Sequence, residues 1–415
     1  GLGDVYKRQE LYRIYFEVKI MKQRVPFYYN EFVCITSECK DNCCIGGWEI
    51  DIDDETYERY NNMTGELKSR ILDSITQNED EEYCFKLCDG KCPMLDDNGL
   101  CEIHKNLGED YLGVVCKQFP RYSEYYGTIK ESGIGLACEE AARIILSENR
   151  PFSMETAACD EEYEPSSEYD SSFALQIFAA REAVFKILAK ESLSIHEKLI
   201  VILDMGSKIQ QCINTDEYDN IKSVVNDYLK EGIDHTLDET RNLSDSGQFE
   251  DISLQQGIRQ ILYPYEEMEV LNPEWEVILK DIIDSLFEQM SDEEYNILNE
   301  EFGTYMVSRA YEYRQLLEYL VFRYFAKSIY DYDFLGKCQM LVTNFFVIRQ
   351  MDIIRWLDNH REYSFKDRMD VVHIFSRQVE YSEDNIENLY EDFIFDDIFK
   401  TDSLIAILWI DSENI

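Results

Sequence analysis

Ten of the thirteen cysteines in this 415-residue chain lie in one early stretch, and this clustering constrains the fold more than any other feature. The ten are Cys34, Cys39, Cys43, Cys44, Cys84, Cys88, Cys92, Cys101, Cys116 and Cys138. Secreted disulfide proteins are usually short and evenly cross-linked, whereas a clustered set in a long chain favours metal binding. Adjacent cysteines such as Cys43 and Cys44 form a disulfide with each other only under strain. We therefore expect metal ligation, with buried reduced thiols as the alternative.

The cysteine spacing indicates a metal site without identifying the metal. Cys39-x3-Cys43-Cys44 and Cys92-x8-Cys101-x14-Cys116 supply more thiolates than one tetrahedral zinc ion needs. Four of them could hold an iron–sulfur cluster or a zinc ion, because thiolate sulfur suits both. The radical S-adenosylmethionine pattern Cys-x3-Cys-x2-Cys would need a cysteine where Gly46 stands, so radical chemistry is disfavoured.

Hydrophobic periodicity and helix-start signals predict that the chain is mainly α. We expect a non-native or disordered leader at 1–20, a cysteine-rich metal-binding α+β domain with short strands at 21–150, a linker at 151–170 and an all-helical domain at 171–415. Within the helical part, one apolar stripe recurs at helical spacing through Phe173, Ile177, Ala180, Val184 and Ile187. Capping boxes at 194–197 and 291–294 mark two helix starts.

Local patterns predict the secondary structure around the cysteines. Alternating apolar and acidic residues at 48–53 indicate a short strand, after which Asp53 or Asp54 begins a helix. The run 96–99 predicts a tight turn between two strands, with Leu95 opposite Leu100. A helix is expected at 139–146, directly after Cys138. His104 is expected to face solvent on a strand, with zinc ligation as the alternative.

Charge and motifs exclude several classes of function. With 84 acidic and 40 basic side chains, the formal net charge is −44, which opposes binding to nucleic acid and to anionic membranes. A basic protein patch is an allowed partner. The sequence contains no run of 18 apolar residues and no signal peptide, so we expect a cytoplasmic location. Walker A, Gly-x-Ser-x-Gly, His-Glu-x-x-His and Rossmann fingerprints are missing.

Several segments resemble the flagellin lysine-N-methylase family. The N-terminal matches are residues 39–51, 90–95, 99–103, 107–109, 116–121 and 138–143, and the softer C-terminal matches are residues 322–325 and 376–385. The chain departs from the family pattern at Tyr381, where a histidine often stands. The resemblance runs from about Met21 to about Asp397 and implies methyl transfer from S-adenosylmethionine to flagellin lysines.

The resemblance also implies a cysteine-bound metal centre, for which an iron–sulfur cluster, of the 4Fe–4S type, is our first choice and zinc the alternative. Arg121 is a candidate for offsetting thiolate charge; the alternative is a surface arginine after a turn. The cysteines that fall on the family's cysteine positions are Cys39, Cys43, Cys44, Cys92, Cys101, Cys116 and Cys138. Not all seven can ligate one four-ligand centre.

Two functions stay open on the sequence. The first is a protein-lysine N-methyltransferase whose metal centre has a structural role. The second is a non-enzymatic metal-binding adaptor or metal carrier, which the missing methyl-donor fingerprint favours. The sequence assigns no catalytic or donor-binding residue.

Overall fold

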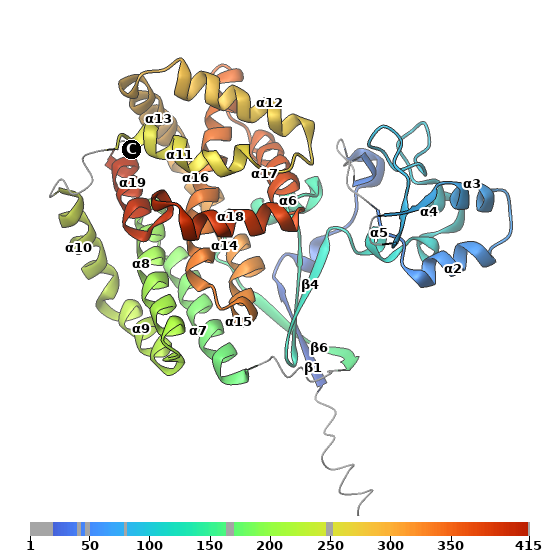
Figure 1. Ribbon diagram of the computed structural model, residues 1–415, viewed down its shortest axis with the longest axis horizontal. Coiled ribbons are helices and arrows are strands. Elements are labelled where there is room, and N and C mark those ends of the chain that lie inside the picture. The colour runs from blue at the N-terminus through green and yellow to red at the C-terminus, as the bar shows by residue number, and fades with distance from the viewer. Residues whose placement is uncertain are drawn as a thin grey trace, which may run out of the picture.

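The computed structural model describes residues 20–39, 43–45, 50–78, 81–162, 170–245 and 252–413, and it is mainly helical with a small sheet region near the N-terminus. Figure 1 shows a large helical body, with the cysteine-rich part standing to one side of it and sheet strands lying between the two. The predicted mainly α fold is confirmed, together with the short strands near the N-terminus. The expected leader lies outside the described residues, except for Ile20.

Helices make up most of the body, and shorter helices occur in the cysteine-rich part. In the cysteine-rich part they are α2 (Asp54–Asn62), α3 (Leu67–Asp73), α4 (Glu102–Leu107) and α5 (Val114–Gln118). In the body they are α6 (Glu139–Leu146), α7 (Ser171–Leu188), α8 (Ile195–Asn214), α9 (Ile221–Asp227), α10 (Ile233–Asp245), α11 (Leu254–Glu266), α12 (Pro273–Ile282), α13 (Asp292–Met306), α14 (Ala310–Tyr324), α15 (Ser328–Asp331), α16 (Phe334–Asp358), α17 (Phe365–Val379), α18 (Glu383–Phe395) and α19 (Thr401–Glu413).

Four strands form a sheet against the body in the order β4-β5-β1-β6, and β2 pairs with β3 in the cysteine-rich part. Their bounds are β1 (Ile20–Pro26), β2 (Ile75–Gln77), β3 (Tyr83–Phe85), β4 (Arg121–Tyr126), β5 (Ile129–Ile134) and β6 (Met154–Glu162). Strand β1 runs parallel to β5 and antiparallel to β6. Strand β6 lies within the segment 151–170 that the sequence predicted as a linker, of which 163–169 lie outside the described residues.

A buried ion pair fixes the sheet to the helical body. The two guanidinium nitrogens of Arg181 on α7 each lie 2.6 Å from a carboxylate oxygen of Glu131 on β5. Apolar residues of β4 and β5, including Tyr126 on β4 and Ile134 on β5, belong to the core of the body. The hydrophobic packing thus joins residues from Tyr122 to Met154 to the helices, whereas the sequence placed the boundary near residue 150.

The cysteine-rich part has a separate small core. It consists of Ile50, Ile52, Tyr60, Met63, Ile71, Phe85, Cys92, Met94 and Ile103. The burial of Ile50 and Ile52 agrees with the predicted alternation, although only Asp51 makes a bridge, to Cys84, and residues 46–49 lie outside the described part.

Helix starts follow the local signals closely. Asp53 caps α2 by accepting a hydrogen bond from the Thr56 backbone N–H at 2.9 Å. Both predicted capping boxes are present, at the starts of α8 and α13. The apolar stripe predicted for α7 is buried, and α6 begins directly after Cys138.

The predicted register around Cys101 is wrong. The turn itself is present, since Asp96 Oδ1 accepts hydrogen bonds from the backbone N–H groups of Asn98 and Leu100. However, Leu95 pairs with Cys101 rather than with Leu100. The chain then enters α4 instead of a strand, so His104 is exposed on a helix. Helix α4 is followed by Gly108, whose φ of 86° suits the end of a helix.

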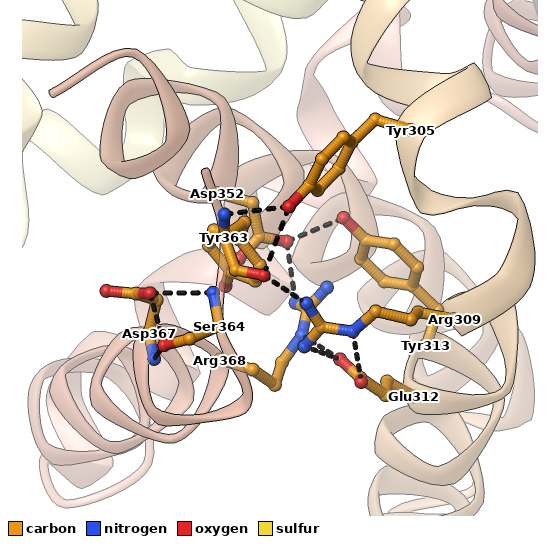
Figure 2. Close-up of polar contacts among 9 residues, drawn as sticks. All are labelled: Tyr305, Arg309, Glu312, Tyr313, Asp352, Tyr363, Ser364, Asp367 and Arg368. Atoms are coloured by element: carbon orange, nitrogen blue, oxygen red, sulfur yellow. Dashed lines mark hydrogen bonds and ion pairs between the residues drawn. The ribbon is translucent and has the colours of Figure 1, made fainter. Parts of the chain in front are cut away.

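A buried polar network ties α14, α16 and α17 together. Asp352 accepts hydrogen bonds from the hydroxyls of Tyr313, at 2.6 Å, and Tyr363, and from Arg368 at 2.6 Å. Glu312 in turn accepts from Arg368 at 3.1 Å and from Arg309. Figure 2 shows these side chains converging from the three helices. Each carboxylate oxygen in this network has a donor, as buried charges require.

Candidate functional site

Three of the predicted cysteine ligands lie in contact. The Cys44 thiol shares hydrogen bonds with Cys43 and with Cys92, which lower the pKa of both partners and raise that of Cys44. The Cys92 backbone N–H also donates to the Cys44 carbonyl oxygen at 2.8 Å. Two segments that are almost fifty residues apart thereby bring their sulfur atoms together.

Two further cysteines of the predicted set face this group. Burial raises the pKa of Cys116 to about 12, with further contributions from Cys92, Cys43 and Cys101. The pKa of Cys101 is raised by burial first and also by Cys92 and Cys43. Cys101, before α4, and Cys116, on α5, both pack against the small core that contains Cys92.

The remaining two predicted ligands lie at the start of α6. Burial raises the pKa of Cys138 to about 11, and Cys43 and Cys34 add to this shift. Cys39 Sγ lies 3.5 Å from Glu139 Oε2, beside Cys138 in the sequence. Among the described residues, no three His, Cys, Asp or Glu side chains are arranged to hold a metal ion. The ligand assignment stays a prediction.

The remaining cysteines are not members of the predicted set. Cys212 and Cys338 are buried in the helical body, as expected for structural thiols, and Cys84 is buried on β3. Cys34 and Cys88 are exposed, and Cys159 is half-buried on β6.

An arginine other than Arg121 acts on a candidate ligand, and the role of Arg121 stays a prediction. Arg121 donates a hydrogen bond to the Phe32 carbonyl oxygen at 3.3 Å and lies over the Phe32 ring. By contrast, Arg377 on α17 acts electrostatically on Cys43. Arg377 belongs to the segment 376–385, which the resemblance had marked without assigning it a role.

A second group of side chains, the tyrosine cluster, assembles next to Cys138. We use this name for Tyr122, Tyr319, Arg323, Tyr324, Glu380 and Tyr381. Glu380 Oε2 accepts hydrogen bonds from the hydroxyls of Tyr319 and Tyr324, each at 2.9 Å, and lies 2.9 Å from Arg323 Nε. The family-like segments 322–325 and 376–385 therefore meet at one buried ion pair.

Aromatic rings surround the Arg323 guanidinium. Its central carbon lies 4.4 Å from the ring centre of Tyr122, 5.5 Å from that of Tyr324 and 5.8 Å from that of Tyr381. Burial opposes the charge of Arg323, but Tyr319, Tyr324 and Glu380 raise its pKa well above the usual value. The guanidinium is thus held as a cation inside an aromatic box.

A short turn joins the tyrosine cluster to the cysteines. The Leu136 backbone N–H donates to the Tyr319 hydroxyl at 3.4 Å, and the Cys138 N–H donates to the Gly135 carbonyl oxygen at 3.2 Å. A Cβ on Gly135 would lie 2.8 Å from Tyr381 Oη, so only glycine allows this approach. Burial raises the pKa of Tyr381 to about 12, and Cys138 contributes to that shift.

Two surface hollows lie away from both groups. One of about 350 Å³ is lined by Asp170, Phe173, Tyr218 and neighbouring acidic residues. The other, of about 220 Å³, lies where α12, α16 and α17 meet. Neither includes a predicted cysteine ligand or a member of the tyrosine cluster.

The molecule is a mainly helical protein with a thiol-rich α+β part at its N-terminal side. Residues 181–407 match the family model described as the FliB lysine N-methylase C-terminal domain. The chain therefore belongs to the FliB lysine N-methylase family, which indicates a lysine methyltransferase. This confirms the resemblance stated from the sequence.

Curated relatives agree with this assignment. The chain is 32% identical over 129 residues, or 30% of its length, to the "Flagellar biosynthetic protein FliU" of Salmonella muenchen, 76% of which is covered. It has the same identity over 129 residues to the "Lysine-N-methylase" of Salmonella typhimurium, of which the match covers 32%. The chain thus spans about a third of the length of that relative. No solved structure matches the chain.

Proposed function

We propose that the protein transfers methyl groups from S-adenosylmethionine to lysine side chains of flagellin. The observation that carries this proposal is the family match over 181–407, supported by relatives named for lysine methylation and for the flagellum. None of the described helices is long and apolar enough to cross a membrane. The formal net charge of −44 favours encounter with a lysine-bearing protein surface.

We also propose that the gathered thiols bind an iron–sulfur cluster, with zinc as the alternative. The donor chemistry fits, because thiol sulfur suits either metal. Cys43, Cys44 and Cys92 would supply the central ligands, with Cys101 or Cys116 as a fourth. When bound, the centre would cross-link the segments that carry these cysteines, which is a structural role.

The reaction requires a neutral amine. Lysine has a free pKa of about 10.4, so holding it neutral near pH 7 costs about 4.6 kcal/mol. An isolated carboxylate would attract the ammonium form but would also raise the pKa and hinder attack. A competent site must therefore bind the amine without stabilising its protonated form.

Calorimetric titration with S-adenosylmethionine separates the two functions that the sequence left open. A methyltransferase should release or absorb heat with a defined stoichiometry. S-adenosylhomocysteine, the product, should compete for the same site, and adenosine alone serves as the control. A protein that gives no heat at high donor concentration would contradict the enzyme and favour the metal-binding adaptor.

A further inference from the structure

The tyrosine cluster contains two buried oxygen atoms whose hydrogen-bonding capacity is unmet. Glu380 Oε2 has three partners, whereas Glu380 Oε1 and the Tyr122 hydroxyl have none among the described residues. Buried polar atoms are nearly always paired, and an exception in a native structure calls for an explanation. These two atoms leave capacity for a ligand that carries hydrogen-bond donors.

Both atoms belong to the surroundings of one guanidinium. Arg323 Nε lies 2.9 Å from the other oxygen of Glu380, and the Arg323 guanidinium stacks over the Tyr122 ring. Arg323 also donates hydrogen bonds to the Tyr324 hydroxyl at 3.0 Å and to the Tyr319 hydroxyl at 3.3 Å. These contacts hold the cluster in one arrangement.

Part of the cluster is accessible to solvent. The Glu380 side chain is fully buried, but the Arg323 side chain is 13% exposed, and Tyr122 and Tyr381 are half-buried. A ligand side chain that reaches the buried carboxylate from these partly exposed residues must be long and thin. Lysine has this shape, with an apolar stem and a polar end.

Resting on the methyltransferase function proposed above, we propose that Glu380 Oε1 and the Tyr122 hydroxyl bind the side-chain amine of the substrate lysine. A neutral primary amine has two N–H donors and one lone pair. Two acceptor oxygens satisfy both donors and leave the lone pair available for the methyl carbon. An ammonium group has a third N–H, which this pair of acceptors leaves unmet.

The charge of Arg323 fits the same role. Arg323 neutralises the charge of Glu380. The carboxylate can therefore accept a hydrogen bond from a neutral amine, whereas an isolated carboxylate would stabilise the ammonium form. The lysine ammonium releases one proton to water before binding. The nitrogen lone pair then forms the N–C bond while the C–S bond of S-adenosylmethionine breaks, and that electron pair goes to sulfur. The products are a methylated ammonium and a neutral thioether.

Two tyrosine variants test this inference with opposite expectations. Tyr122→Phe removes a hydroxyl that has no hydrogen-bond partner among the described residues. The melting temperature of this variant should therefore not fall, while its kcat for flagellin methylation should drop roughly tenfold or more. The matched control is Tyr313→Phe, which removes a hydrogen bond to the buried Asp352 (Figure 2). That variant should melt earlier and keep the wild-type kcat per folded molecule. Wild-type kcat in Tyr122→Phe, or equal losses in both variants, would overturn the inference.

A binding measurement makes the test independent of turnover. Protein labelled with ¹³C at the tyrosine ζ carbon is titrated with n-butylamine at about pH 9, where part of the amine is neutral. The Tyr122 signal, identified by its loss in Tyr122→Phe, should shift, and Glu380→Gln should weaken that shift. A Tyr122 signal that does not move would contradict the inference. If the Tyr122 signal shifts but the protein does not methylate flagellin, the amine-binding inference would stand and the proposed function would be refuted.

Discussion

The cysteine-rich part and the helical body are stabilised by different means. The former has nine buried apolar side chains in its own core, whereas the core of the latter runs from Tyr28 to Trp409. A single core in a part of roughly 70 residues rarely supplies more than about 3–5 kcal/mol. The body instead adds buried ion networks, such as that of Arg368, Asp352 and Glu312 (Figure 2). The comparison shows that apolar burial is extensive in the body and small in the cysteine-rich part, where the proposed metal centre would add stability.

Removal of the proposed metal should have the largest effect, and it should affect the cysteine-rich part without affecting the body. Cys92→Ser or Cys116→Ser should lower the metal content and unfold the cysteine-rich part, because a structural centre contributes on the order of 10 kcal/mol. Hydrogen exchange should then show lost protection at 50–116 and native protection in α8 and α16. Elemental analysis of anaerobically purified protein identifies the metal as iron or zinc.

Cys338→Ser is the control for this prediction, since Cys338 is fully buried in the body and outside the predicted set. Its metal content should match that of the wild type. Equal metal loss in all three variants would show that the ligand assignment is wrong.

Breaking the ion network should affect the body alone, by a smaller amount. Asp352→Asn leaves Arg368 without a full counter-charge in a site where both side chains are fully buried, so we expect a loss of about 3–5 kcal/mol in the free energy of unfolding. Denaturant unfolding followed by tryptophan fluorescence measures it. The exposed pair of Arg361 and Glu301 provides the control, and Glu301→Gln should cost under about 1 kcal/mol. Equal effects of the two variants would mean that burial does not set the strength of these pairs.

Acid should destabilise the body through protonation of Asp411. We expect this effect to be smaller than those of metal removal and of breaking the ion network. Burial opposes its charge, but Arg349 and His196 lower the pKa of Asp411 to about 2 from 3.8. A carboxyl group whose pKa is lower in the folded than in the unfolded state stabilises the fold at pH values above its unfolded-state pKa, here by about 2 kcal/mol. This stabilisation is lost as the pH falls from about 4 to about 2. The stability gap between wild type and Asp411→Asn should therefore narrow over that range in urea unfolding. A gap that stays constant down to pH 2 would refute this account of Asp411.

Local signals predicted much of the fold, because helix starts depend on neighbouring residues. Asp53, Ser194 and Ser291 cap helices as expected. The pairing of β6 with β1 was missed, since it joins acidic residues after 154 to a strand more than a hundred residues earlier. The helix at 102–107 was missed because a strong turn signal before it favoured a hairpin.

The candidate site was predictable only in part. Clustered cysteines in the sequence indicated that sulfur atoms would gather, and Cys43, Cys44 and Cys92 do so. The tyrosine cluster could not be assembled from the sequence, because its members come from β4, α14 and the end of α17. The segments 322–325 and 376–385 were visible as family-like motifs, yet the unmet oxygen of Glu380 is a property of the folded chain alone.

The most direct test of the account is mass spectrometry of flagellin incubated with the metal-loaded protein and S-adenosylmethionine. We predict mass increases in steps of one methylene group, located on lysine side chains and missing when the donor is omitted. Donor-dependent increases should also vanish on flagellin whose lysines have been acetylated beforehand. Unmodified flagellin after prolonged incubation with protein that binds the donor would contradict the assignment of flagellin as the substrate.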